Sequence, residues 1–158
     1  MYSLPNSTRS LATLAAISLV VAGGCVVAPP GSSVNQPIAV PIIQTSPLSL
    51  SGAQEVPPVT TSALGTGSFE IPANRSITGS IATTGINATA AHIHLGAVGS
   101  NGPVVVALTR SGDNTWSVPP STTLTAEQYA SYLAGNLYVN VHTTLHPDGE
   151  IRAQFKPK

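Results

Sequence analysis

Leu137-Tyr-Val-Asn-Val-His-Thr143 is the stretch of this 158-residue chain that most directly indicates its fold. Apolar side chains at positions 137, 139 and 141 alternate with tyrosine, asparagine and histidine at positions 138, 140 and 142. Successive side chains of a strand point to opposite faces, so this alternation predicts a β-strand with one face turned to the core and the other turned away from it.

A second stretch, Ala91-His-Ile-His-Leu-Gly96, repeats the pattern. Its apolar residues at 91, 93 and 95 share one face of the expected strand, and His92 and His94 share the other. Two imidazoles one residue apart on an extended chain therefore project from the same side, which is how a strand presents a pair of metal ligands.

The remaining elements follow from turn residues and β-branched runs. A hairpin is expected from 64–71 and 76–83, with further strands at 90–95, 104–109, 115–118, 137–143 and 150–155. One helix is expected after Thr125, where Gln128 completes a capping box and Gly135 ends the helix. The sequence thus predicts an all-β fold, an antiparallel two-sheet β-sandwich of Greek-key type with one short helix.

Composition limits the function. Only 8% of the residues are charged and the formal net charge is zero, so the basic surface of a nucleic-acid-binding protein is missing and nucleic acid is excluded as a partner. Catalysis also finds little support, because no nucleophile elbow is present and no serine stands out as a nucleophile. We therefore expect a binding protein rather than an enzyme.

The N-terminal residues predict export. Arg9 precedes an apolar run over 11–22, and residues 1–24 are interpreted as a signal peptide. The single cysteine, Cys25, follows Ala-Gly-Gly and resembles the lipidated cysteine of bacterial lipoproteins, which would place the chain in the cell envelope, periplasmic or surface-exposed, with a lipid in the membrane. Ordinary signal cleavage after Ala28 is the alternative. Residues 25–47 are proline-rich and predict an extended tether, followed by the domain at 48–158.

The histidines are the candidate functional residues. If the two strands described above pair, then His92, His94 and His142 converge on one point, where neutral imidazoles would suit copper, with zinc as the alternative. Glu55 could orient one of the histidines from behind, and His146 is at most an auxiliary ligand. Alternatively, the histidines are solvated or hydrogen-bonded structural residues on an outer sheet face. Glu150 and Arg152 are interpreted as a structural ion pair.

Five motifs in order resemble the chordin-domain (CHRD) family. They are Leu50-Ser-Gly-Ala-Gln-Glu-Val-Pro-Pro58, Ala91-His-Ile-His-Leu-Gly96, Asn101-Gly-Pro-Val-Val-Val106, Leu137-Tyr-Val-Asn-Val-His-Thr143 and Gly149-Glu-Ile-Arg152. The resemblance implies a β-sandwich found in secreted bacterial proteins and repeated in the animal chordins that antagonise growth factors. The His-x-His strand is also similar to the copper-binding strand of copper/zinc superoxide dismutases, but four histidines and one cysteine make dismutase activity a poor fit.

Two functions of different classes follow from these observations. The first is an envelope-anchored domain that binds a transition metal for sequestration, delivery or structural use. The second is a metal-free module that binds another envelope or extracellular protein through a sheet face or through the loop at 99–103.

Overall fold

The computed structural model describes residues 47–157. The predicted signal peptide, Cys25 and nearly all of the predicted tether lie outside the described residues. Within them the chain forms nine antiparallel strands and one α-helix, which confirms the predicted all-β fold. The strands are β1 (Leu48–Ser51), β2 (Leu64–Glu70), β3 (Thr78–Thr84), β4 (Ala90–Leu95), β5 (Val104–Ala107), β6 (Thr109–Gly112), β7 (Thr115–Ser117), β8 (Leu137–His142) and β9 (Ile151–Gln154).

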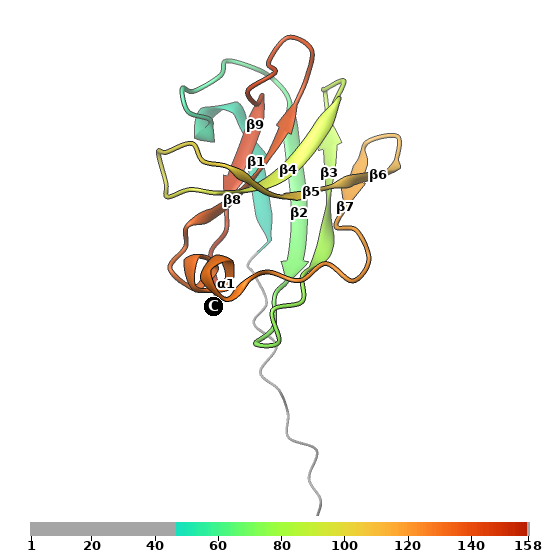
Figure 1. Ribbon diagram of the computed structural model, residues 1–158. Helices are drawn as coiled ribbons and strands as arrows, with labels where there is room; N and C mark the ends of the chain where they lie inside the picture. The colour runs from blue at the N-terminus through green and yellow to red at the C-terminus, as the bar shows by residue number, and fades with distance from the viewer. Residues whose placement is uncertain (1–46, 158) are drawn as a thin grey trace, which may run out of the picture. The chain divides into compact units, whose positions relative to one another are not determined.

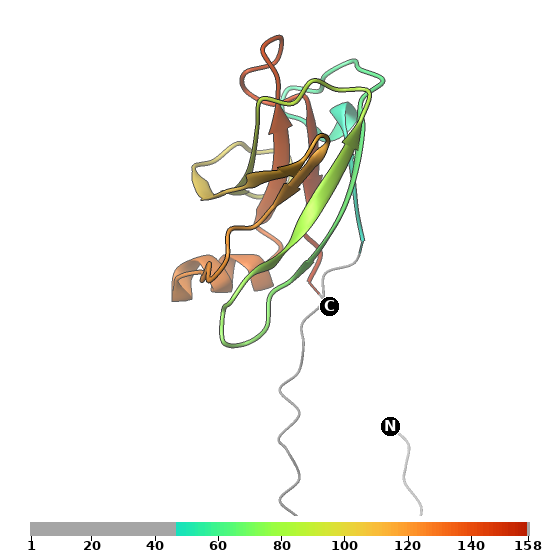
Figure 2. The ribbon, with the colours of Figure 1, turned by 90° about the vertical axis from the view of Figure 1, so that its right-hand side faces the viewer.

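The strands hydrogen-bond in the order β5-β4-β8-β9-β1-β2-β3-β7-β6. β5 and β6 stand at the two ends of this order, yet only Leu108 separates them in the chain. The sheet must therefore curl until its two ends come within the reach of one residue. Figures 1 and 2 show the strands wrapping around a common interior in this way.

The two layers expected of a sandwich are present as the two halves of this curled sheet. β1 joins β9 through a single residue pair, Ser51 with Arg152, whereas β1 pairs with β2 over four residues. Both halves contribute to one core, with Leu50, Phe69 and Ile81 on one side and Ile93 and Val139 on the other. The apolar residues of the two alternating stretches therefore point inward, as their parity predicts.

Two details differ from the sequence-based expectation. The strand expected over 104–109 divides at Leu108, because β5 pairs with β4 and β6 pairs with β7 at the other end of the sheet. The first strand, β1, was not expected as a separate element. Its four residues alternate between buried leucines and more exposed serines, a pattern too short to be distinguished from the end of the tether.

The helix α1 (Ala126–Leu133) lies at one end of the sheet (Figure 1). Its predicted capping box is confirmed: the Gln128 backbone N–H donates to the Thr125 side chain, and the Thr125 N–H donates to the Gln128 side chain. Tyr132 is buried against the core. Within residues 47–157, no helix has the length and apolar character needed to cross a membrane.

Thr125→Ala is expected to lower the free energy of unfolding by about 1 kcal/mol, because it removes the side-chain acceptor at the start of the helix. Urea unfolding followed by circular dichroism measures the change. Thr144→Ala, at an exposed loop position, is the control and should change stability by less than about 0.5 kcal/mol. Equal effects of the two substitutions would contradict the capping role.

Candidate metal centre

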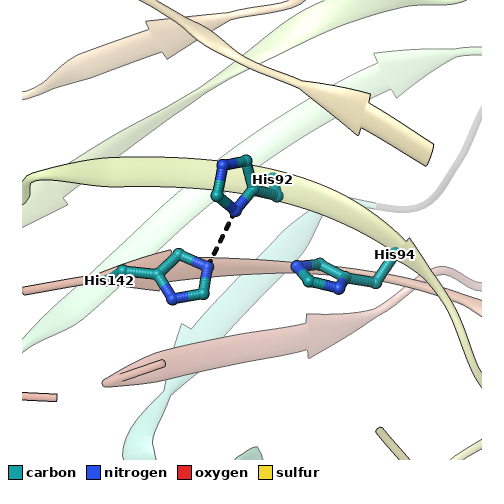
Figure 3. Close-up of side chains that lie close together, drawn as sticks. All are labelled: His92, His94 and His142. Carbon is teal, nitrogen blue, oxygen red and sulfur yellow. Dashed lines mark hydrogen bonds between the residues drawn. The ribbon is translucent and has the colours of Figure 1, made fainter. Parts of the chain in front are cut away.

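Three histidines from two neighbouring strands meet on the face of the sheet opposite the core. His92 and His94 lie on β4 and His142 ends β8, and the register sets His92 opposite Asn140 and His142 opposite Ala90. One nitrogen of each ring lies within 4.8 Å of the corresponding nitrogens of the other two. Figure 3 shows the three rings turned toward one another. The predicted convergence of the three imidazoles is therefore confirmed, and the cluster is compatible with a metal ion.

Backbone carbonyl groups fix the protonation of two of the rings. The Nδ1 atom of His94 lies 2.9 Å from the Gly102 oxygen, and Nδ1 of His142 lies 2.9 Å from the Pro147 oxygen. A carbonyl oxygen only accepts, so each Nδ1 must carry the proton and each Nε2 keeps its lone pair. This is the arrangement in which an outer hydrogen bond prepares a histidine to bind a metal through its other nitrogen.

The third ring completes the cluster. Nδ1 of His92 lies 3.0 Å from Nε2 of His142. Because the proton of His142 is on its Nδ1 atom, its Nε2 atom accepts this hydrogen bond. His92 Nδ1 therefore carries a proton and donates it in the metal-free protein. In contrast, Nε2 of His94 is buried and has no hydrogen-bond partner. A buried acceptor without a partner is costly, and a bound cation would satisfy it.

The surroundings of His92 and His94 favour the neutral form of both imidazoles. Burial lowers the pKa of His92, and the neighbouring His142 and His94 lower it further. Burial likewise lowers the pKa of His94, although the hydrogen bond to Gly102 opposes this effect. Neutral imidazole is the form that ligates metals, so the lowered pKa values of His92 and His94 favour cation binding at these two rings.

Tyr138 links the cluster to a buried arginine. The ring of His94 stacks on that of Tyr138 with centroids 4.8 Å apart and planes 9° apart. The guanidinium carbon of Arg152, on the other neighbouring strand, lies 3.4 Å from the same tyrosine centroid. Arg152 is only 1% exposed and donates to Asn101, Ala97, Ser100 and Gln154. It thereby ties the loop at 96–103 over the histidine-bearing face.

Glu55 lies in the same covered region, next to Asn140 rather than next to a histidine. Oε1 of Glu55 and Oδ1 of Asn140 are both buried without a hydrogen-bond partner. Gly149 makes this packing possible, because a Cβ atom there would come within 2.6 Å of both side chains and its φ of +132° favours glycine. The amide of Asn140 lowers the pKa of Glu55 and raises the pKa of His94, so it is close to both side chains. The structure therefore places Glu55 behind the cluster, one side chain removed from His94.

Burial raises the pKa of Glu55 to about 7, although Arg152, the Val56 N–H and Asn140 oppose the shift. The folded protein therefore holds this proton more tightly than the unfolded chain does. The resulting stabilisation is complete below the ordinary pKa of 4.5 and is lost as the pH rises to about 7. His92 and His94, whose pKa values are lowered, act in the opposite direction, so this contribution has to be isolated with a variant.

Glu55→Gln is expected to become more stable relative to the parent protein as the pH rises from 4.5 to 7.5, by about 2–3 kcal/mol across this window. The measurement is urea unfolding of both proteins at five pH values. Glu70→Gln, which alters an exposed carboxylate, is the control and should show no such trend. A stability difference that is independent of pH would contradict the raised pKa.

The other predicted residues lie apart from the cluster. His146 lies in the loop between β8 and β9, outside the three-histidine group, where its carbonyl accepts from the N–H groups of Thr143 and Gly149.

The predicted ion pair between Glu150 and Arg152, both of which the structure describes, is wrong. The Glu150 carboxylate accepts instead from the hydroxyls of Thr61 and Thr143.

Sequence reasoning did not assign Tyr138, Asn140, Arg152 or Gly102 to the site. The first three alternate along β8 and β9 onto the same sheet face as the histidines, and this alternation was the signal in the sequence that could have identified them. No pattern indicated that loops would bury this face to the point where Asn140 is 2% exposed. Gly102 is required because a Cβ atom at this position would collide with the Leu95 carbonyl oxygen.

A curled antiparallel sheet with an imidazole cluster beneath its loops defines a compact all-β module with a candidate metal centre. The family model described as CHRD domain matches residues 46–155. The chain therefore belongs to the CHRD family. No curated protein and no solved structure matches it.

Proposed function

We propose that this CHRD protein is an exported, envelope-anchored module that binds one transition-metal ion through His92, His94 and His142. The observation that carries the proposal is the convergence of three ring nitrogens within 4.8 Å, two of them freed for ligation by backbone carbonyls that hold the opposite ring nitrogen. Metal uptake requires His92 to give up its Nδ1 proton and the three rings to move closer together, because two ligands about 2.0 Å from one ion lie at most about 4 Å apart.

Copper is the proposed metal. Imidazole ligands suit copper, zinc and nickel, and the affinity of a nitrogen site for divalent ions peaks at copper. The 3.0 Å between His92 Nδ1 and His142 Nε2 already fits two ligands of one ion. Bonds of about 2.0 Å separate two ligand atoms by about 2.8 Å at a right angle and about 3.3 Å at the tetrahedral angle. The 3.0 Å distance lies between these two values, so the preference for copper rests on its higher affinity for nitrogen ligands.

Membrane attachment through Cys25 is the second part of the proposal. The cysteine follows the apolar run and two glycines, and the proline-rich segment after it would hold the domain away from the bilayer. Metabolic labelling with a fatty acid tests this part. Label on the wild type that disappears in Cys25→Ser supports the anchor, and equal label on both proteins, or none on either, refutes it.

Metal titration of the full chain tests the central part. The protein is stripped with a chelator and then dialysed against copper(II), zinc(II) and nickel(II) in separate experiments at pH 7.5. We expect one copper ion per chain, bound more tightly than zinc or nickel. Copper binding no stronger than that of the variant lacking all three histidines would refute the proposal and favour the metal-free interaction module.

A further inference from the structure

A pocket opens directly beside the histidine cluster. It has a volume of about 320 Å³, and His94 and His142 line it together with Tyr138. Its other walls come from three loops, at Val56–Pro57, Asn101–Gly102 and Pro147–Asp148. One water molecule takes up about 30 Å³ of liquid volume, so the pocket has room for a small molecule and not only for a single bound water.

The cluster leaves a coordination position unfilled by protein. Within residues 47–157, the group of side chains close enough to share an ion consists of the three histidines alone. Structural zinc sites are closed by four protein ligands, whereas sites with three protein ligands keep a position for water or another molecule. Because His94 and His142 also line the pocket, an ion held by the cluster would lie next to it.

The charges around the pocket indicate what would enter it. Imidazole binds a metal in its neutral form, so three histidine ligands would contribute no charge against a divalent ion. The acidic residue that lines the pocket is Asp148, and the guanidinium of Arg152 lies against the ring of Tyr138, another lining residue. A site holding a divalent ion therefore keeps a net positive charge, which favours a small anion over a neutral or cationic molecule.

We infer that the metal-loaded cluster accepts a small monoanion as an additional ligand, and that the anion enters through the pocket formed by the loops at 56–57, 101–102 and 147–148. This inference rests on the proposed metal-binding function. It adds that the centre is open and exchanges a ligand with solvent, which a purely structural metal site does not do.

Azide serves as the probe, because its binding to copper(II) produces a new charge-transfer absorption band and alters the electron paramagnetic resonance spectrum. The full chain is loaded with one copper(II) ion and titrated with azide, and the copper content is measured again after gel filtration. We expect a saturable band that fits a single site, with copper retained. A loaded protein that shows no band, or that releases its copper to azide, overturns the inference while leaving the metal-binding proposal intact. Failure to load copper refutes the metal-binding proposal instead.

Two pairs of variants test the route through the pocket. Val56→Trp adds bulk to the pocket wall and should weaken azide binding at least about tenfold, whereas Leu133→Trp, on the exposed surface of α1, should not change it. Asp148→Asn removes the negative charge beside the site and should strengthen azide binding roughly two- to fivefold. Asp113→Asn, in the exposed β6–β7 turn, is its control. Azide affinities that are the same in all four variants would exclude the pocket as the route.

Discussion

If His94 is a copper ligand as proposed, His94→Phe is expected to lower the affinity for copper more than about 100-fold. Losing even an outer hydrogen-bond partner of a ligand costs about 10–100-fold, and this substitution would remove the ligand itself. Phenylalanine preserves the aromatic stack on Tyr138, where the rings are 4.8 Å apart. The loss of affinity can therefore be separated from a loss of packing. Equilibrium dialysis against copper(II) measures the effect.

His146→Phe is the matched control, because His146 lies outside the three-histidine group. It should bind copper as the wild type does. Should His94→Phe fold poorly, His142→Gln offers a second test at a half-buried position. Wild-type affinity in both cluster variants would show that the histidines are structural residues and not ligands.

Arg152→Met is expected to lower the free energy of unfolding by about 3 kcal/mol or more. The substitution removes hydrogen bonds to Asn101, Ala97 and Ser100, together with the cation–π contact to Tyr138. A hydrogen bond donated by a charged group contributes about 1.5–3 kcal/mol, and Glu55 also loses the positive charge that favours its ionised form. Thermal and urea unfolding measure the change.

Arg110→Met is the matched control, because Arg110 also covers an aromatic ring, that of Trp116 at 4.7 Å, but from an exposed position. Arg110 also donates to the Asp113 and Ala88 carbonyls, and its replacement should lower the free energy of unfolding by about 1–2 kcal/mol. Arg152→Lys retains the charge without the planar fork and should give an intermediate value. Equal decreases in the free energy of unfolding for Arg110→Met and Arg152→Met would mean that the burial of Arg152 does not increase its contribution to stability.

The strands and the histidine cluster were predictable because both depend on the period of two along a strand. Alternation over 90–95 and 137–143 fixed which side chains share a face, and the structure places them accordingly. The capping box at Thr125 was equally local. Features that depend on a few neighbouring residues can be inferred without knowing the rest of the fold.

The loops that bury the histidine-bearing face could not be predicted in the same way. Arg152 was interpreted as one half of an ion pair with Glu150, because the two residues are two positions apart. Apart from Gln154, its hydrogen-bond partners lie about fifty residues earlier, in the loop that includes Asn101. Likewise, the chain pairs with β4 before Leu108 and with β7 after it, because the two edges of the curled sheet meet there. The alternation of side chains within one strand carries no information about where the edges meet.

His92 and His142 are 50 residues apart in the chain, and only the paired β4 and β8 bring them together. An ion held between these strands would bind the native chain and not the unfolded one. At a free metal concentration 100 times the dissociation constant, such linkage adds about 2.7 kcal/mol to native stability. If the protein binds copper as proposed, its resistance to proteolysis would rise and fall with the copper concentration, and its abundance would follow.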